Sequence, residues 1–229
     1  MKAFLKSLIS KRPPAGILPK IDLPSLVPFK ECQLTVIEPA VANGNVSIYE
    51  LLAIVLLVRA RQPKALFEIG TFDGRTTLNL AANALKDSRV HTLDLPSSRL
   101  DQTRFNVEEI EKIYIAKPVS GSRFLGRPEG SNIIQHYGDS AEFDFGPYFG
   151  QMDFVFVDAS HAYEYVLNDS RIALNLLRQG KGIILWHDYN RPEWWPGVLK
   201  ALDELYTGSP AFSRLRQIEG TSLACLVAD

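Results

Sequence analysis

The sequence predicts an α/β protein with a doubly wound parallel sheet and helices on both of its faces. Between residues 65 and 188, five short β-rich runs alternate with segments of helical pattern. Parallel strands need a long return path, which a helix supplies, so this alternation is typical of right-handed parallel crossovers. Two later runs, 214–219 and 222–228, are separated only by Gly220 and Thr221. A connection this short joins antiparallel strands, so the sheet is expected to end in a hairpin.

The individual elements follow from local patterns along the chain. Strands are expected in the runs ALFEIG (65–70), VHTLDL (90–95), NIIQHYGD (132–139), MDFVFVD (152–158) and GIILWHD (182–188). Helices are expected near 75–87, 100–112, 162–178 and 197–206. A further helix over 47–61 has a capping-box spacing, Ser47 with Glu50, and Pro63 ends it.

The first 46 residues contain six prolines and few periodic apolar positions. They predict a Pro-rich N-terminal arm or cap outside the core, followed by one domain over 47–229. Because such an arm has little core of its own, it is also the surface through which we expect any homo-oligomer to form.

Charge and composition exclude several classes of protein. Lys and Arg total 25 against 26 Asp and Glu, a net charge of −1, so a nucleic-acid partner is not expected. The longest apolar run, 51–58, is too short for a membrane span. Two distant cysteines, Cys32 and Cys225, indicate a reducing, cytoplasmic compartment.

The most informative motif is a strand that enters a glycine-containing turn and then a helix, over residues 67–77. Gly70 and Gly74 would let the backbone approach a nucleotide-like cofactor closely. The glycines are four apart, unlike a dinucleotide GxGxxG motif, and Glu68 and Asp73 beside them would repel a pyrophosphate. Carboxylates attract an ammonium group instead, so the turn favours S-adenosylmethionine over NAD.

Acidic residues recur at the ends of the next two predicted strands. Asp94, 20 residues after Gly74, is placed to accept hydrogen bonds from both hydroxyls of a ribose. Asp139 and Ser140 follow the third strand and could bind the exocyclic amine of adenine. Each aspartate alone is equally explained as a cap of the turn that follows. Their recurrence at one edge of the sheet favours a ligand site, because ligands of open α/β sheets bind beyond the carboxyl ends of the strands.

Taken together, these motifs resemble class I S-adenosylmethionine-dependent methyltransferases. The matching segments are FEIGTFDGRTT, HTLDLP, HYGDSA, VFVDASHAYEYVLND and GIILWHDY, within about residues 47–229. The resemblance is strongest to the small-molecule O-methyltransferase-like group, which includes catechol-type enzymes, macrolide sugar O-methyltransferases and cephalosporin hydroxylase-like proteins. It implies a seven-stranded sheet of order 3-2-1-4-5-7-6 with strand 7 antiparallel.

The candidate catalytic residues are His161, His187 and Asp188, at the ends of the fourth and fifth predicted strands. Together with Asp158 they suit either a divalent-metal site or a general base next to the transferred methyl group. The resemblance places Mg²⁺ on Asp158 and Asp188, with His187 where some relatives have an acidic ligand. Catechol-type enzymes have Asn directly after the second aspartate, whereas Tyr189 stands there in this chain. A third interpretation is that the two histidines only hydrogen-bond neighbouring loops.

The resemblance and the motifs together define one expected site and one expected activity. The cofactor-binding set is Glu68, Gly70, Thr71, Phe72, Asp73, Thr76, Asp94, Asp139, Ser140 and Asp158. The expected activity transfers a methyl group from S-adenosylmethionine to a hydroxyl of a small molecule, either a sugar or a natural-product-like acceptor. The alternatives are a diverged hydroxylase-like protein and a non-catalytic protein that binds S-adenosylmethionine.

Three further segments are expected to border the acceptor. The broken stretch 114–131 is too long for a normal connection and suits a lid, whose Lys117, Arg123 and Arg127 could meet an acidic acceptor or lie in solvent. Trp194 and Trp195 could form a wall of the acceptor pocket or pack against the arm. Asp169, in contrast, is expected to be structural, near the start of its helix.

Overall fold

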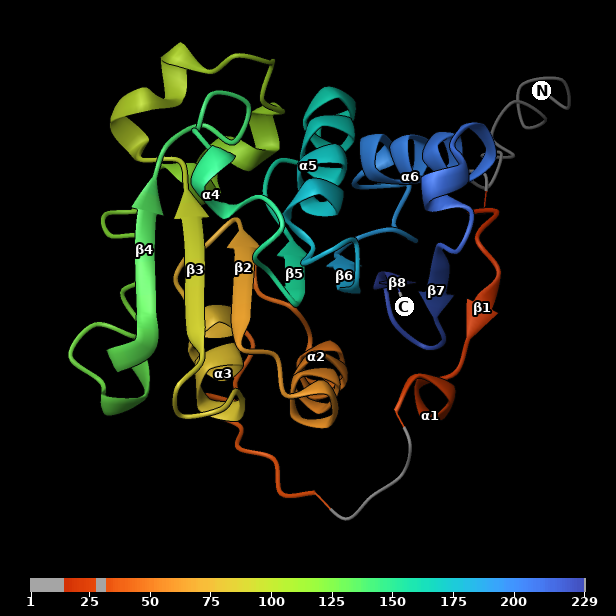
Figure 1. Cartoon of the computed structure of the whole chain (residues 1–229). Coiled ribbons are helices and arrows are strands. Elements are labelled where there is room, and N and C mark those ends of the chain that lie inside the picture. The colour runs from red at the N-terminus through yellow and green to blue at the C-terminus, as the bar shows by residue number, and fades with distance from the viewer. Residues whose placement is uncertain (1–14, 28–31, 229) are drawn as a thin grey trace, which may run out of the picture.

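The computed structural model describes residues 15–27 and 32–228, and within them a single mixed sheet has eight strands (Figure 1). The strands are β1 (Lys20–Ile21), β2 (Ala65–Ile69), β3 (Arg89–Asp94), β4 (Ile133–Tyr137), β5 (Phe154–Val157), β6 (Gly182–Trp186), β7 (Arg216–Ile218) and β8 (Ala224–Ala228). Their order is β1-β7-β8-β6-β5-β2-β3-β4, and β8 runs antiparallel to both β6 and β7. The predicted fold class, the strand order and the hairpin are confirmed, with β1 as an additional edge strand.

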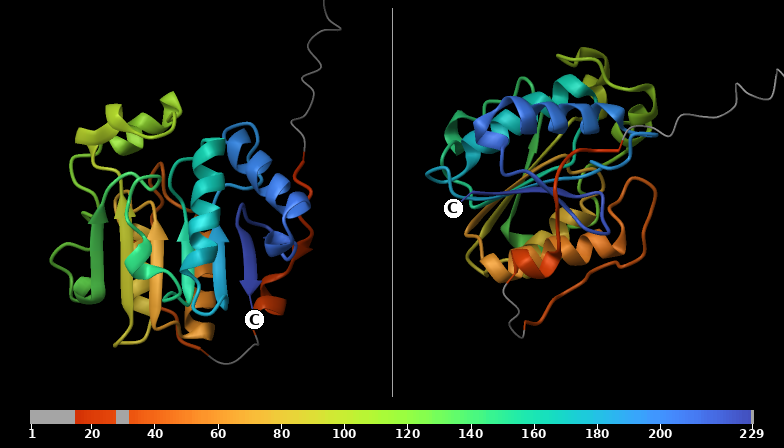
Figure 2. Two further views of the ribbon diagram at one scale, coloured as in Figure 1. Left: turned by 45° about the horizontal axis from the view of Figure 1, so that its top comes forward. Right: turned by 90° about the vertical axis from the view of Figure 1, so that its right-hand side faces the viewer.

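Helices cover both faces of the sheet (Figure 2). They are α1 (Leu23–Leu26), α2 (Ile48–Arg61), α3 (Arg75–Asn83), α4 (Lys112–Ile115), α5 (Tyr163–Leu176) and α6 (Pro196–Gly208). Strand residues alternate between the faces: Phe154 and Phe156 of β5 pack with α2 and α3, whereas Val155 and Val157 pack with α5 and α6. In the part of the chain described, no helix is long and apolar enough to cross a membrane.

Helix α2 begins as its sequence predicts. The Ser47 side chain accepts a hydrogen bond from the Glu50 amide at 3.2 Å, and the Ser47 amide donates to Glu50 Oε2 at 2.9 Å. The reciprocal bonds satisfy two amides that a helix start leaves unpaired. The helix ends at Arg61, where Gln62 adopts a left-handed conformation before Pro63.

The prediction of a helix over 100–112 is wrong. This stretch contains two short 3₁₀ turns, Ser97–Gln102 and Glu109–Glu111, and the helical turn α4 follows the second. Between the turns, the Arg104 amide donates to Asp139 Oδ2 at 2.7 Å, a bond that a continuous helix would not allow. Few apolar side chains of this stretch are buried, so there is no apolar stripe to hold a helix on the sheet. Helix α3 also ends earlier than expected, at Asn83.

The predicted arm contributes more to the core than its prolines indicate. Residues 1–14 and 28–31 lie outside the described part, but Lys20 and Ile21 pair with Gln217 and Ile218 of β7. Leu18 and Val46 are buried, each in the core on a different face of the sheet. Because proline restricts φ without preventing burial, an extended segment can cover the sheet edge while lacking any periodic pattern.

Helix α3 holds the arm through side chains that bind its backbone. The buried guanidinium of Arg75 donates to the carbonyl oxygens of Glu38 and Val46, both at 2.8 Å, and of Pro39 at 3.3 Å. One and two turns further on, Asn79 and Asn83 each exchange a pair of hydrogen bonds with the extended backbone of the arm. These side chains do for the arm what a neighbouring strand would do.

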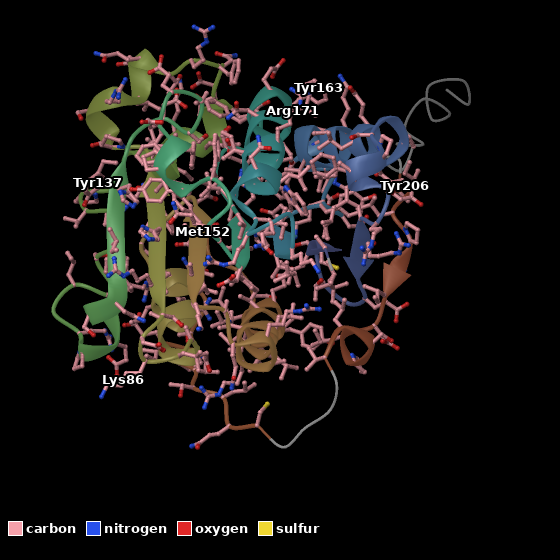
Figure 3. All side chains as sticks on the ribbon, in the orientation of Figure 1. Lys86, Tyr137, Met152, Tyr163, Arg171 and Tyr206 are labelled. Atoms are coloured by element: carbon pink, nitrogen blue, oxygen red, sulfur yellow. The ribbon has the colours of Figure 1, made fainter. Side chains whose placement is uncertain are left out.

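We expect Arg75→Met to lower the free energy of unfolding by about 3 kcal/mol, because it removes three hydrogen bonds of roughly 1 kcal/mol each, one of them to the buried carbonyl of Val46. Urea denaturation followed by circular dichroism measures this change. The matched control is Arg171→Met, which removes an exposed arginine on α5 (Figure 3). Equal stabilities for the two variants would contradict the anchoring role of Arg75.

Candidate functional site

A cavity of about 700 Å³ lies at the carboxyl ends of the parallel strands. All thirteen residues predicted for the site line it, although they come from five strands, the loops that follow them and the first turn of α3. The arm, the 3₁₀ turn before α4 and the segment after β6 complete its walls. Pockets of 300–1,000 Å³ are typical of small-molecule sites, so the volume accommodates a cofactor and an acceptor together.

Gly70 shapes the loop after β2 by letting another loop approach. Its φ is +103°, and a Cβ atom there would lie 2.0 Å from the carbonyl oxygen of Asp158. From the sequence, Gly70 was expected to let a ligand approach the backbone closely, whereas its observed neighbour is the loop after β5. Two residues later, Phe72 has φ +50°, a strained conformation for a residue with a side chain.

Glu68 presents a carboxylate oxygen without a partner to this cavity. The side chain is buried, and its Oε2 accepts hydrogen bonds from the hydroxyls of Thr77 and Thr92. Within the described part of the chain, Oε1 has no hydrogen-bond partner. Burial raises the pKa of Glu68 to about 8 despite the two hydroxyls. A cation in the cavity would therefore satisfy Oε1 and favour the ionised carboxylate.

Asp94 lies beside the same loop, but its hydrogen-bonding positions are filled by the protein. Oδ1 accepts from the amides of Thr71 and Phe72, at 3.3 and 3.2 Å. Oδ2 contacts the Lys117 ammonium at 2.6 Å and the Ser120 hydroxyl. A ribose at Asp94 would have to share or displace these last two groups.

The basic residues of 114–131 pair with carboxylates of the protein. Besides Lys117 with Asp94, Arg123 contacts both Asp73 and Glu38, and Arg127 contacts Glu38. Ion pairs thereby connect the segment to the loop after β2 (residues 70–73) and to the arm. This pairing leaves the suggested contact with an acidic acceptor without support.

Two other aspartates have structural partners. Asp139 accepts hydrogen bonds from the Tyr165 hydroxyl at 2.8 Å and from the amides of Arg104 and Ala141. Burial, together with the bond to Asp139, raises the pKa of the Tyr165 phenol. Asp169 is the seventh residue of α5 and lies in its interior, so the predicted position at the helix start is wrong. Burial raises the pKa of Asp169 to about 7, and Asn168 donates to its Oδ1 at 2.9 Å.

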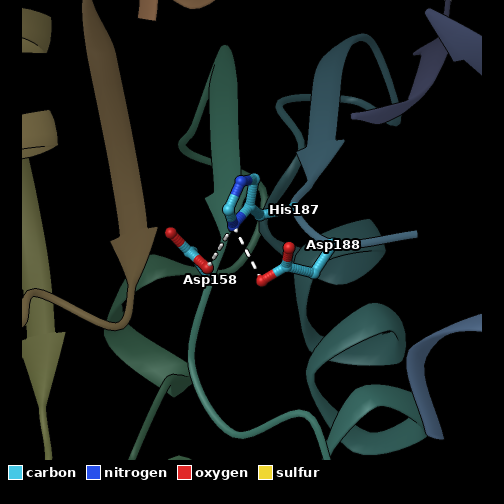
Figure 4. A group of neighbouring side chains, drawn as sticks. All are labelled: Asp158, His187 and Asp188. Carbon is cyan, nitrogen blue, oxygen red and sulfur yellow. Dashed lines mark hydrogen bonds and ion pairs between the residues drawn. The ribbon is translucent and has the colours of Figure 1, made fainter. Parts of the chain in front are cut away.

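Asp158, His187 and Asp188 form a compact group at the ends of β5 and β6 (Figure 4). Nδ1 of His187 lies 3.2 Å from Asp158 Oδ1 and 3.1 Å from Asp188 Oδ2. Each of the three residues offers one possible metal-ligating atom, and these three atoms all lie within 4.8 Å of one another. Asp188 has φ +60°, a strain of the kind that concentrates at functional sites.

Each imidazole of the cluster is held by carboxylates at both nitrogens. His161 Nδ1 lies 2.7 Å from Glu111 Oε1, and its Nε2 lies 3.1 Å from Asp188 Oδ2. His187 Nε2 lies 3.4 Å from Glu50 Oε2. These carboxylates raise the pKa of His161 to about 9 and that of His187 well above its ordinary value, against the opposing effect of burial.

Further residues of the site were not predicted. Glu50 was interpreted only as a helix cap, yet its Oε1 also accepts from the Ser222 amide and hydroxyl, which fixes it beneath His187. Glu111 lies in an acidic stretch with no distinguishing local pattern, and it becomes a site residue only because that stretch folds against Ser160 and His161, in the loop after β5. Trp195 stacks on His161, with 4.0 Å between the ring centroids.

The doubly wound sheet and the cavity at its carboxyl edge define a class I methyltransferase fold. The family model described as "Methyltransferase domain" matches residues 67–189, more than half of the chain. The chain therefore belongs to this methyltransferase family, which confirms the resemblance seen in the sequence. A search of curated proteins finds no match.

Several solved structures share the fold at low identity. PaMTH1, an SAH-bound methyltransferase of Podospora anserina, is 19% identical with a TM-score of 0.58, over 82% of this chain and 81% of that one. TomG, an O-methyltransferase of Streptomyces achromogenes involved in tomaymycin synthesis and solved with SAM, is 20% identical with a TM-score of 0.52, over 99% and 95%. An O-methyltransferase of Bacillus cereus in complex with SAH is 19% identical with a TM-score of 0.55, over 81% and 84%.

We expect Glu111→Gln to lower the pKa of His161 by about one unit or more, because it removes the negative charge next to Nδ1. Titration of the His161 ring signals by NMR measures the change. Glu109→Gln, in the same 3₁₀ turn but with an exposed side chain, is the matched control and should leave that pKa where it is. An unchanged His161 pKa in Glu111→Gln would show that Asp188 alone sets the charge of the ring.

Proposed function

We propose that this protein transfers the methyl group of S-adenosylmethionine to a hydroxyl of a small molecule. The observation that carries the proposal is that Glu68, which lines the cavity, has a buried carboxylate oxygen, Oε1, without a hydrogen-bond partner. An ammonium group supplies the donor that this oxygen lacks, and Asp94 and Asp158 add negative charge that disfavours a pyrophosphate. That PaMTH1, TomG and the Bacillus protein were solved with SAM or SAH agrees with this choice.

The remaining cofactor contacts follow from the order of the strands. The loop from Gly70 to Asp73 would hold the methionine part, and Asp94 at the end of β3 would bind the ribose. Asp139 and Ser140, at the end of β4, would border the adenine. This arrangement leaves the group around Asp188, at the ends of β5 and β6, for the acceptor hydroxyl.

A divalent metal would fit the group of Asp158, His187 and Asp188 once His187 has lost its Nδ1 proton. Cis ligands of a six-coordinate ion lie about 3 Å apart when each metal–ligand distance is about 2.1 Å, close to the 3.1 and 3.2 Å measured from His187 Nδ1. An imidazole ligand suits Mn²⁺ less than Zn²⁺ or Fe²⁺, and suits Mg²⁺ least, so the donor set points away from a purely oxygen-ligated magnesium site. When bound, such an ion would lower the pKa of the acceptor hydroxyl and orient its oxygen.

The surrounding residues would position the reacting groups. His161 and His187 have a carboxylate at every ring nitrogen, so neither ring offers a free lone pair to a hydroxyl in this arrangement. We therefore assign His161 a positioning role: stacked on Trp195, it holds Asp188 in its strained conformation. In the transfer, the methyl carbon would bond to the acceptor oxygen, the sulfonium sulfur would keep the electron pair of the broken C–S bond, and the hydroxyl proton would pass to solvent through the open cavity.

Calorimetric titration with S-adenosylmethionine and S-adenosylhomocysteine tests the proposed cofactor. Both ligands should bind, and Glu68→Gln should weaken binding by roughly 10- to 100-fold, the range for loss of a charged hydrogen bond. Glu164→Gln, at an exposed site on α5, is the control and should bind as the wild type does. If neither ligand binds the wild-type protein, the proposed function is wrong.

The metal proposal is tested separately by titrating Mn²⁺ and Zn²⁺ into metal-free protein, without cofactor or acceptor. Asp158→Asn should weaken metal binding by about tenfold or more, because it removes one of the two negative ligands. Asp144→Asn changes an exposed aspartate outside the cavity and should have no effect. Equal metal affinity for the wild type and Asp158→Asn would overturn the metal assignment and leave the cofactor proposal untouched.

A further inference from the structure

Four large apolar side chains lie exposed around the same cavity. They belong to Val41, Ile110, Ile113 and Trp194, with 54%, 41%, 61% and 59% of their surface accessible. They come from three segments far apart in sequence: the arm, the turn leading into α4, and the loop after β6. Exposed apolar side chains that gather at the edge of a polar cleft are typical of a ligand-binding surface.

Three of the four are next to a residue that is fixed at the site. Ile110 precedes Glu111, which contacts His161, and Trp194 precedes Trp195, which stacks on the same ring. Ile113 precedes Tyr114, whose ring packs edge-on against Phe72 at 5.7 Å. These three apolar side chains are therefore held around the reaction site by the contacts of their neighbours.

Polar groups on the same walls are largely engaged with one another. The Tyr114 hydroxyl donates to Asn43 Oδ1 at 3.2 Å, and Arg191 Nε lies 3.2 Å from Asp188 Oδ1. Lys117 contacts Asp94, and Glu111 contacts His161. A polyhydroxylated acceptor would bury several hydroxyls here with few partners to replace water, which is unfavourable.

We infer that the methyl acceptor carries its reacting hydroxyl on an extended, uncharged apolar body, which lies against Val41, Ile110, Ile113 and Trp194. This inference rests on the proposed function, because it places the hydroxyl at Asp158, His187 and Asp188. Of the two acceptor classes expected from the sequence, it favours the natural-product-like molecule over a free sugar. The occupant is a small molecule, since the four side chains line a cavity that continues to the reacting groups.

Binding of three probes to the complex of the protein with S-adenosylhomocysteine tests this inference. The probes are 2-naphthol, 1-decanol and methyl glucoside, which present a hydroxyl on an aromatic, an aliphatic and a polyol body. We expect at least one of the two apolar probes to bind about tenfold or more tightly than methyl glucoside. The stronger of the two shows whether the apolar body is planar or a chain.

Two variants of the apolar rim connect this preference to named residues. Trp194→Ala and Ile113→Ser should each weaken binding of the preferred probe about fivefold to tenfold and leave binding of S-adenosylhomocysteine unchanged. The matched control is Phe149→Ala, which removes an exposed aromatic side chain outside the cavity. Retained binding of S-adenosylhomocysteine shows that the variants are folded.

Three outcomes would overturn the inference. They are preference for methyl glucoside, absence of binding by both apolar probes, and unchanged probe affinity in Trp194→Ala and Ile113→Ser. If those two variants instead convert a dimer to a monomer in analytical ultracentrifugation without affecting the probes, the rim is a contact between copies of the chain, and the inference is also wrong. The probe results are obtained with S-adenosylhomocysteine already bound, whereas absence of S-adenosylhomocysteine binding by the wild type would refute the proposed function itself.

Discussion

Four carboxylates are buried or nearly so around one edge of the sheet, and the arrangement of the site depends on how their charge is balanced. Glu50, Glu111, Asp158 and Asp188 surround two imidazoles, and Arg191 contacts Asp188 from the cavity side. With both rings protonated the group still has a net charge of −1. Such a cluster would be strongly destabilising without these pairings, because desolvation of each ion is costly. The remaining negative charge makes the site receptive to a cation, either a metal or a sulfonium.

This electrostatic constraint explains why distant parts of the chain converge on the site. Glu50 belongs to the first turn of α2 and is held by Ser222 just before β8, so the start and the end of the domain meet beneath His187. Glu111 comes from another part of the chain, a 3₁₀ turn in the connection between β3 and β4. A continuous helix over 100–112, as the sequence predicted, would not have turned the chain in this way.

Local sequence patterns predict the strands of this protein, whereas several site residues are brought together only by its tertiary structure. Runs such as 152–158 predict strands because a strand covered on both faces of the sheet needs consecutive apolar residues. The order of the strands came from the family resemblance. Asp158 and Asp188 could be found because they follow such runs directly. Glu111 could not be found, because its role depends on a connection without periodicity. Asp169 was misplaced although the start of its helix was predicted to within one residue, because the seventh residue of a helix already lies beyond its first turn. Strand β1, Lys20–Ile21, was not predicted because two residues are too few to show a periodic pattern.

The arm shows how a segment without secondary structure can determine the shape of a ligand site. Its backbone is bound by Arg75 and two asparagines of α3, a helix that begins directly after the cofactor loop. Asn45 of the arm donates to Asp73 in that loop, and Asn43 accepts from Tyr114 across the cavity. Val41 lies between Pro39, whose carbonyl oxygen accepts from Arg75, and Asn43, which accepts from Tyr114, so the chain is held on both sides of it. The hydrogen bonds that hold the loop 70–73 therefore also hold the arm beside the proposed acceptor region. A change in the conformation of this loop is expected to move Val41 as well.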